Sequence, residues 1–206
     1  MYIPKMFENK DTQSILEFIQ QHPFGILITQ GVENIIATHI PLLLYKLENG
    51  QHVLRGHLAR ANSQHLNWQK TGETDVLAIF TGAHAYISSS WYEKPNVSTW
   101  NYIAAHVYGK LKILEGEALH AAMSDLTRHF EAGQAKPMLV ENMPTELVRR
   151  ELRGIVGFEI AIEQLQGKEK LSQNRNPADY QHIIQELDKS SYPDAKAVAE
   201  AMRKKI

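Results

Sequence analysis

After one short helical pattern that ends at Pro23, strand-like segments follow one another through the first half of the chain. Runs of β-branched and large apolar residues, bounded by turn residues, occupy 24–30, 34–46 and 52–59. The first two flank a glycine turn and are expected to form a hairpin, with Pro41 at a bulge or an edge position. Most strands precede the main helices, and strands and helices do not alternate regularly. This order favours an antiparallel barrel with helical decoration over a doubly wound fold.

The rest of the chain adds further strands and then helices. Strands are predicted at 76–82, 85–89, 102–116 and 154–167. Helices are predicted from Asn62 or Ser63 to Gly72, from 119 to 133, from Pro144 to 152, from Asn176-Pro177 onward, and from about Pro193 to the basic tip Arg203-Lys204-Lys205. We therefore expect a mainly β protein with helices (α+β), in one domain over 1–206 with a loop and helical extension at about 167–206.

Composition excludes several classes of function. The 206 residues are 43% hydrophobic and 22% charged, and the net charge of −1 provides no global attraction to nucleic acid or to an anionic membrane. The absence of cysteine excludes disulfides and thiolate chemistry, and it is compatible with a reducing cytoplasm. The N-terminus lacks the apolar core of a signal peptide, and the run 35–44 is too short to span a bilayer, so we expect a cytoplasmic protein.

Ten histidines raise the question of a metal site. His39, His57, His84 and His106 fall on different predicted strands rather than at a local ligand spacing, so we expect structural histidines and predict no metal site. The sequence also lacks the motifs of serine hydrolases, nucleotide kinases and dinucleotide-binding proteins.

Aromatic residues are concentrated between Gly82 and Gly109, which hold six of the 17 Phe, Tyr and Trp residues of the chain. Short polar side chains lie among these rings, so that Tyr86 and Trp100 are candidates to stack on a ring while Ser88 and Asn101 hydrogen-bond its edge. Flat apolar faces mixed with such groups suit a planar, partly polar ligand. The alternative is an ordinary core with aromatic packing and polar loop residues.

Two other segments supply positive charge. In 54–64, Arg60 and Asn62 fall where a strand ends and a helix begins, an arrangement that can hold a phosphate. In 167–177, Lys168, Lys170 and Arg175 lie among amide and hydroxyl groups, in a loop that can close over an anion. The alternatives are a solvated Arg60 with a capping Asn62, and a solvated basic loop.

Six motifs, in this order along the chain, give it a resemblance to the PaiB-type family of FMN-binding proteins. They are MYIPKMF, THIPLLL, GHLARANSQ, HAYISSSWY, STWNY and KLSQNR. The resemblance implies a split β-barrel related to pyridoxamine 5'-phosphate oxidase, with FMN bound at the interface of a homodimer. One departure is Met6, where relatives often carry a histidine, which leaves that position without an expected role.

The resemblance also implies which residues contact the flavin. Arg55, His57, Arg60 and Asn62 would cradle the phosphate and the ring edge. Tyr86 and Ser88 would line the adjoining strand, and Trp100 and Asn101 would lie beside the ring. The remaining contacts would come from Lys170, Ser172, Gln173 and Arg175.

Two functions remain open at this point. The resemblance implies an FMN-binding negative transcriptional regulator, and the family label allows direct DNA binding, which the neutral charge does not support. The alternative is a small FMN-dependent oxidoreductase acting on a small molecule, with His57, His84 or Tyr86 as a proton donor. The sequence assigns no catalytic residue and does not decide whether the protein is an enzyme.

Overall fold

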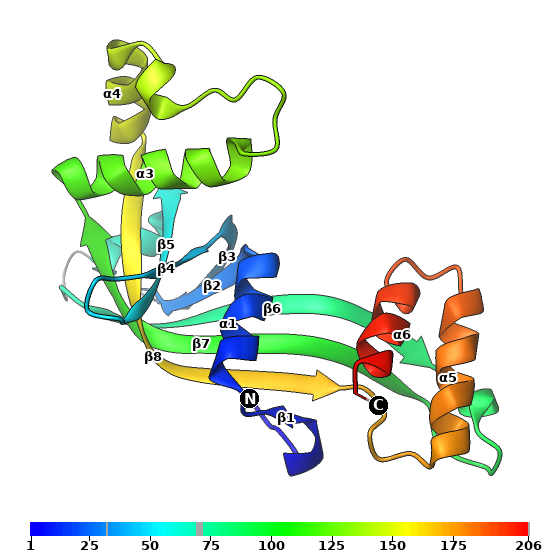
Figure 1. Ribbon diagram of the computed structural model, residues 1–206. Coiled ribbons are helices and arrows are strands. Elements are labelled where there is room, and N and C mark those ends of the chain that lie inside the picture. The colour runs from blue at the N-terminus through cyan, green and yellow to red at the C-terminus, as the bar shows by residue number, and fades with distance from the viewer. Residues whose placement is uncertain (32, 69–71, 206) are drawn as a thin grey trace. The chain divides into compact units, whose positions relative to one another are not determined.

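The computed structural model describes residues 1–31, 33–68 and 72–205 and shows the α+β class that the sequence predicts (Figure 1). Its strands are β1 (Glu8–Asn9), β2 (Phe24–Gln30), β3 (Ile35–Pro41), β4 (Leu43–Lys46), β5 (His52–Ala59), β6 (Thr74–Ile87), β7 (Thr99–Leu114) and β8 (Ile155–Lys170). Its α-helices are α1 (Thr12–Gln21), α3 (Gly116–Glu131), α4 (Thr145–Arg153), α5 (Pro177–Lys189) and α6 (Ala195–Arg203). Short 3₁₀ helices are η1 (Lys5–Phe7), η2 (Ser63–Leu66), η3 (Ser89–Trp91) and η4 (Val140–Asn142).

One sheet contains all of these strands. Its order is β3-β2-β6-β7-β8-β5-β4, and β1 pairs with β8. The pairs β2/β3, β2/β6, β4/β5 and β5/β8 are antiparallel. The predicted hairpin at the start of the chain is therefore confirmed, as is the mainly antiparallel character of the fold.

Leu42 joins the two strands that stand at opposite ends of this order. It is fully buried, and its N–H donates to the carbonyl oxygen of Pro23 at 2.7 Å. The prediction of one continuous run over 34–46 was wrong, because β3 ends at Pro41 and β4 begins at Leu43, with Leu42 alone between them. Pro41 has no N–H to donate to a neighbouring strand, and it ends an edge strand as expected. This link connects the two ends of the strand order.

The strand β6 also differs from the prediction, which placed two strands at 76–82 and 85–89. The first predicted strand ends at Gly82, where β6 in fact continues. A Cβ atom at Gly82 would lie 2.8 Å from Cε2 of Phe18, so the glycine makes room for a ring instead of forming a turn. The predicted helix at 62–72 is described only in part, as η2 with Asn62 at its N-cap, and residues 69–71 lie outside the described residues.

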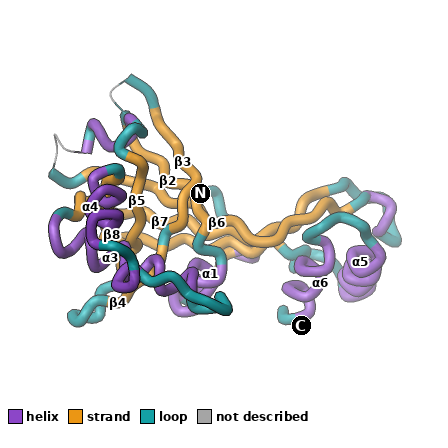
Figure 2. Tube along the Cα trace, turned by 90° about the horizontal axis from the view of Figure 1, so that it is seen from above, coloured by secondary structure: helices purple, strands orange, loops and turns teal. Residues whose placement is uncertain are grey.

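The chain forms two compact units. Unit 1 comprises 1–18, 80–106 and 166–206, and unit 2 comprises 19–79 and 107–165. The strands β6, β7 and β8 contribute residues to both. The predicted extension belongs to unit 1, where α5 and α6 lie side by side (Figure 2) and bury Ile183, Leu187 and Val198. The expectation of a single domain stays a prediction.

In unit 2 the helix α3 crosses beside the end of β5, with α4 next to it (Figure 1). Gly157 of β8 allows this approach, because a Cβ atom there would collide with the Cδ1 atom of Leu119 on α3. Leu114, Ala122 and Met123 are buried at this contact. The helix α3 therefore covers the face of the sheet toward which a Cβ atom of Gly157 would point.

Candidate functional site

Four rings gather on the surface of unit 1. Trp100 lies 6.0 Å from Tyr86, 6.1 Å from His84 and 6.1 Å from Tyr192, measured between ring centroids. The exposed fractions are 46% for Trp100, 46% for Tyr86 and 39% for Tyr192. Large rings exposed together on one surface are typical of a binding site, because folding ordinarily buries them.

Neighbouring strands and one loop position this ring cluster, which we define as His84, Tyr86, Trp100 and Tyr192. Tyr86 is on β6, Trp100 is on β7, and Tyr192 precedes α6. Nδ1 of His84 lies 3.2 Å from a carboxylate oxygen of Asp194, which holds the imidazole against the cluster. Sequence reasoning singled out Tyr86 and Trp100 as ring-stacking residues but missed Tyr192, which no local pattern marks.

Lys170 brings positive charge to the same surface. Its ammonium group donates to the carbonyl oxygen of Trp100 at 2.9 Å and to the hydroxyl of Thr99. Burial lowers the pKa of Lys170, and the charges of Lys168 and Arg175 lower it further. Three cations thus act on one another in this part of unit 1, which favours the presence of an anion there.

Asn101 and Ser172 lie inside the protein. Their exposed fractions are 0% and 3%, and the side chains bond to each other, with Asn101 Nδ2 donating to Ser172 Oγ at 2.9 Å. Gln173 donates to the carbonyl oxygen of Glu169 at 2.6 Å and accepts from the N–H of Leu171 at 2.8 Å. These three side chains therefore shape the loop after β8.

The other two predicted residues of unit 1 have local partners as well. The guanidinium carbon of Arg175 lies 4.5 Å from the ring centroid of Tyr92, a cation–π contact. Among the described residues, Nε of Arg175 is buried without a hydrogen bond. Ser88 caps η3 by accepting from the N–H of Ser90 at 3.2 Å.

In unit 2, Arg60 and Asn62 follow β5 as predicted. Arg60 Nε donates to the carbonyl oxygen of Arg153 at 2.8 Å, and Nη2 donates to that of Ile155 at 2.7 Å. These two hydrogen bonds use Nε and Nη2 of the guanidinium group, and the residue is exposed. The backbone around Arg60 is thereby fixed to the start of β8.

A buried amide network supports this segment. Asn62 donates to Thr38 Oγ1 at 3.0 Å and accepts from the N–H of Gln64 at 2.9 Å. The fully buried Gln64 amide donates to the carbonyl oxygens of Leu27 and Ile36, at 3.1 and 3.2 Å. Sequence reasoning missed Thr38 and Gln64 as residues that position Asn62, although Thr38 lies in the THIPLLL motif.

Arg55 and His57 share one face of β5 but have different surroundings. Arg55 Nη2 lies 2.8 Å from a carboxylate oxygen of Glu159, which is 5% exposed and also pairs with Lys112 at 3.0 Å. Burial alone would raise the pKa of Glu159, but hydrogen bonds from Lys112 and Arg55 lower it. His57 instead lines a cavity beside α3 and α4, and burial lowers its pKa.

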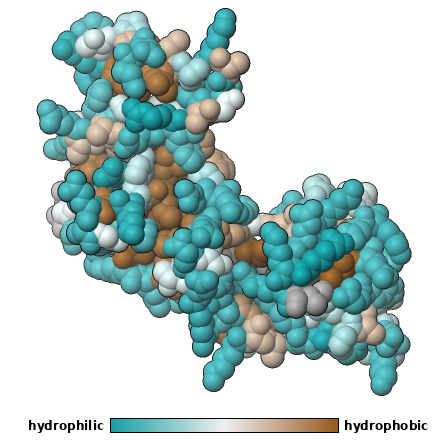
Figure 3. All heavy atoms as spheres, in the orientation of Figure 1, coloured by the Kyte–Doolittle hydropathy of each residue, from teal (hydrophilic) through white to brown (hydrophobic). Residues whose placement is uncertain are grey.

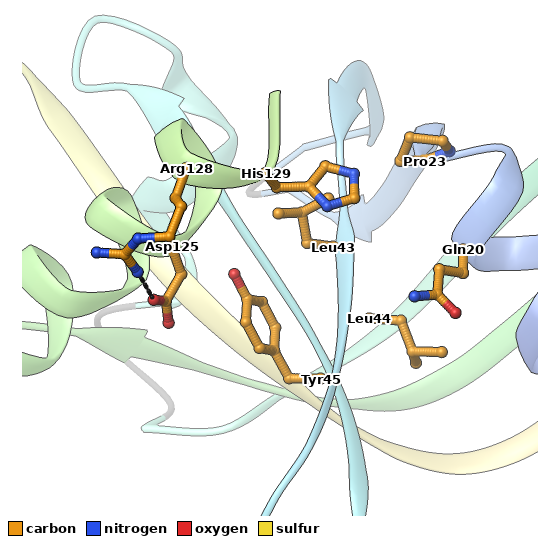
Figure 4. Close-up of a pocket in the computed structure, with 8 residues that line it drawn as sticks. All are labelled: Gln20, Pro23, Leu43, Leu44, Tyr45, Asp125, Arg128 and His129. Atoms are coloured by element: carbon orange, nitrogen blue, oxygen red, sulfur yellow. Dashed lines mark hydrogen bonds and ion pairs between the residues drawn. The ribbon is translucent and has the colours of Figure 1, made fainter. Parts of the chain in front are cut away.

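A second cavity, of about 320 Å³, lies between β4 and α3 (Figure 4). The phenol of Tyr45 points toward α3, where Asp125 and Arg128 form an ion pair at 3.1 Å. The guanidinium carbon of Arg55 lies 4.8 Å from the centroid of the Tyr45 ring. The charges of Asp125 and Arg128 offset each other in this cavity, so the pair offers no net charge to a ligand.

Within residues 1–31, 33–68 and 72–205, no three His, Asp or Glu side chains are grouped so as to hold a metal ion. Over the same residues, no helix combines the length and the apolar character needed to cross a membrane.

Comparison with known proteins gives a family. A family model described as "Putative FMN-binding domain" matches residues 1–164. The protein named "Protease synthase and sporulation protein PAI 2" of Bacillus subtilis (strain 168) is 41% identical to this chain over 206 residues, covering 100% of this chain and 98% of that protein.

Solved structures give the fold. The flavocytochrome Anf3 from Azotobacter vinelandii is similar with a TM-score of 0.61 and 11% identity, over 87% of this chain and 78% of that one. The FAD and heme binding protein from Mycobacterium smegmatis is similar with a TM-score of 0.59 and 15% identity, over 79% of this chain and 73% of that one. The resemblance found in the sequence motifs is confirmed. The chain has the split β-barrel fold and belongs to the family of FMN-binding domains, with FMN as its cofactor.

Proposed function

We propose that the protein is a homodimeric, cytoplasmic FMN-binding regulator of the same type as PAI 2, in which the redox state of the flavin is the regulatory input. The observation that carries this proposal is the exposed ring cluster beside Lys170, in a chain that belongs to a family of FMN-binding domains. Bound FMN supplies transfer of one or two electrons. The residues of the chain bind and orient it.

The chemistry of the ring cluster fits a flavin. Trp100, Tyr86 and Tyr192 present apolar faces to a planar group, and Lys170 provides a cation next to the Trp100 carbonyl. The buried pair of Asn101 and Ser172 has a positioning role in this proposal, because it shapes the loop that carries Arg175. We therefore assign Tyr86, Trp100, Lys170 and Arg175 to direct contact, and Ser88, Asn101, Ser172 and Gln173 to support.

The residues after β5 fit a phosphate. Among the described residues, the hydrogen bonds of the exposed Arg60 involve Nε and Nη2 and not Nη1, and the amide of Asn62 is fixed by Thr38 and Gln64. A charge-assisted hydrogen bond from arginine is a strong phosphate contact. Arg55 has a positioning role here, since Glu159 already pairs with it, and His57 lines the cavity beside α3.

The exposed rings support the proposal of a dimer. A monomer would leave several large apolar faces in water, which favours a second copy of the chain on this surface. Light scattering at micromolar concentration is expected to give the mass of two chains. Replacing Trp100 by glutamate is expected to shift the mass toward one chain, whereas the same change at Phe130, an exposed ring of α3 outside the cluster, leaves it unchanged.

Direct contact with DNA is not part of this proposal. Two of the three cations in the basic tip at the end of α6 have partners within unit 1, where Arg203 pairs with Asp188 and Lys205 pairs with Glu169. On α4, Arg149 pairs with Glu146 and Arg150 pairs with Glu151. Proteins that grip DNA need such charges free to replace counterions. Regulation would act through a partner protein or through the flavin.

A second candidate function is a small flavin oxidoreductase. The observation in its favour is the half-exposed His84, which belongs to the ring cluster and pairs with Asp194. Histidine is the side chain that most often acts as a general acid or base in enzymes. Of the three proton donors suggested by the sequence, His84 and Tyr86 are on this surface, whereas Nδ1 of His57 is buried.

The decisive experiment is titration of the purified protein with FMN, followed by flavin absorbance and tryptophan fluorescence. We expect one FMN per chain, and we expect Trp100→Leu to weaken binding about tenfold. Phe130→Leu, which also removes an exposed ring, serves as the matched control. Failure of the wild-type protein to bind FMN would overturn both candidate functions. Consumption of NAD(P)H or pyridoxamine phosphate by the FMN-loaded protein would favour the oxidoreductase, and a salt-dependent shift of promoter DNA would contradict the absence of direct DNA contact.

A further inference from the structure

Three cations of unit 1 stand without an opposite charge. They are Lys168 and Lys170, at the end of β8, and Arg175 in the loop that follows. Within residues 1–31, 33–68 and 72–205, their side chains contact carbonyl oxygens, a hydroxyl group and ring faces, and none of them pairs with a carboxylate. Cations held inside a protein are ordinarily paired, so this arrangement favours a bound anion.

Lys168 is the most buried of the three, with an exposed fraction of 8%. Its ammonium group donates to the carbonyl oxygen of Tyr2 at 3.1 Å. The same nitrogen lies 5.1 Å from the ring centroid of Tyr102 and 5.9 Å from that of Tyr2. Carbonyl dipoles and ring faces stabilise a cation, but they carry no net charge that could offset it.

The two lysines lie on the face of the sheet that carries Trp100. Lys168 and Lys170 are two residues apart on β8, so their side chains leave the strand on the same face. Trp100 and Tyr102 have the same relation on β7, the neighbour of β8 in the sheet. The ammonium group of Lys170 reaches the carbonyl oxygen of Trp100 at 2.9 Å. The cations therefore adjoin the ring cluster.

The carboxylates near this surface are engaged elsewhere. Glu169 lies between the two lysines in sequence, but it leaves the opposite face of β8 and pairs with Lys205. Asp194, at the ring cluster, pairs with His84 at 3.2 Å. Figure 3 shows a largely hydrophilic surface over α5 and α6, where charged side chains of opposite sign are paired. A bound group is the remaining source of negative charge for the three cations.

The two redox forms of FMN differ in the charge of the ring. The oxidised ring is neutral, and uptake of two electrons and one proton gives a reduced ring with one negative charge. The phosphate is common to both forms, so its contacts cancel when their affinities are compared. A unit charge within about 10 Å of a partly buried cation changes affinity by roughly tenfold or more. Cations beside the ring therefore discriminate between the two forms.

We propose that Lys168, Lys170 and Arg175 make the protein bind reduced, anionic FMN more tightly than oxidised FMN. This inference rests on the proposed function, and it specifies how the redox state of the flavin is sensed at the same site. A ligand shifts the state of a protein only through a difference in affinity, and the charge of the ring provides that difference. Lys168 acts here through its charge, from beneath the ring faces of Tyr2 and Tyr102.

The test is a redox titration of the FMN-loaded, full-length protein with dithionite, combined with direct titration of oxidised FMN. We expect the wild type to bind the reduced form about a hundredfold more tightly, which places its midpoint potential about 60 mV above that of free FMN. Lys168→Met should reduce this preference about tenfold, or about 30 mV, with little effect on oxidised FMN. Lys196→Met, at an exposed lysine of α6 whose charge is not among those that act on Lys170, should leave the preference unchanged.

Proton uptake by the wild-type protein makes the test independent of the variants. In mildly acidic solution, free FMN takes up two protons with two electrons, because its reduced ring becomes neutral. The bound flavin is expected to take up one proton there, seen as a midpoint potential that changes by about 30 mV per pH unit instead of about 60 mV.

Three results would overturn this inference while leaving FMN binding intact. They are equal affinities for the two forms, uptake of two protons by the bound flavin, and equal effects of Lys168→Met and Lys196→Met on the preference. Failure of oxidised FMN to bind would overturn the proposed function as well.

Discussion

The side chains of Asn101 and Ser172 form a buried pair in which the amide and the hydroxyl are each other's hydrogen-bond partners, at 2.9 and 3.1 Å. Ser172 has a φ of 63°, the left-handed conformation that serine adopts only at a cost of about 1 kcal/mol. The partner amide comes from β7, far away in the sequence. Asn101 therefore holds the loop after β8 in a conformation that the loop would not choose alone.

Asn101→Ala is expected to lower the free energy of unfolding by about 1–3 kcal/mol, because it leaves the Ser172 hydroxyl buried without its partner. Ser172→Gly removes that hydroxyl and relieves the backbone, so the double variant should be less destabilised than the sum of the single variants. Urea unfolding measures both the single effects and their coupling, which we expect to be about 1 kcal/mol. Strictly additive effects would contradict a direct pair.

Gly109→Ala is expected to be among the most damaging small substitutions, at about 3 kcal/mol or more, because the new Cβ would collide with the backbone carbonyl of Ala161. Backbone in a paired strand cannot move aside cheaply. Gly133→Ala is the matched control, since no atom lies within 4 Å of a Cβ at that position. Thermal unfolding of the two variants should separate them clearly, and equal stabilities would show that β8 can shift.

Tyr45 should give the stability of the protein a dependence on alkaline pH. Burial and the charge of Asp125 raise the pKa of Tyr45 to about 12, from an ordinary value of 10.0. Between these two values the unfolded chain loses the phenol proton and the folded chain keeps it. The stability that Tyr45 contributes is therefore fully present below pH 10 and is lost as the pH rises through 12.

We expect Tyr45→Phe to remove this part of the alkaline loss, seen as a smaller fall in the urea midpoint between about pH 9 and about pH 11. Asp125→Asn should lower the pKa of Tyr45, measured as phenolate absorbance. Parallel curves for wild type and Tyr45→Phe would rule out this role. The comparison cancels the other tyrosines, because both proteins share them.

Arg60→Ala is expected to weaken FMN binding by about 1.5–3 kcal/mol, the contribution of a charge-assisted hydrogen bond to phosphate. Arg60 also bonds the carbonyl oxygens of Arg153 and Ile155, so the variant will lose some stability. Arg153→Ala, an exposed arginine in the same region, is the matched control for charge. Riboflavin, which lacks the phosphate, should bind both variants and the wild type alike. Loss of riboflavin affinity in Arg60→Ala would assign the effect to structure.

The sequence predicts the class of fold and the surface rings better than it predicts individual contacts. The sequence places Tyr86 and Trp100 in one candidate site, and their ring centroids lie 6.0 Å apart because residues near the same end of two adjacent strands meet in space. Tyr192 joins them only through the packing of α5 and α6, which no local pattern encodes. Asn101 and Ser172 have polar side chains that suit either contact with a ligand or a buried pair. In the structure both are buried and bonded to each other. Gly82 shows the same ambiguity, since a glycine can mark a turn or make room for a ring.

The one-residue link at Leu42 has a consequence for how the barrel assembles. When β3 pairs with β2, the chain carries β4 to the opposite end of the sheet order, tethered by a single residue. Such a short tether gives the second edge a high effective concentration near the first. Bringing the two edges together then costs little chain entropy. A flexible insertion after Leu42 would slow the pairing of β5 with β8 more than it would lower the stability of the folded protein.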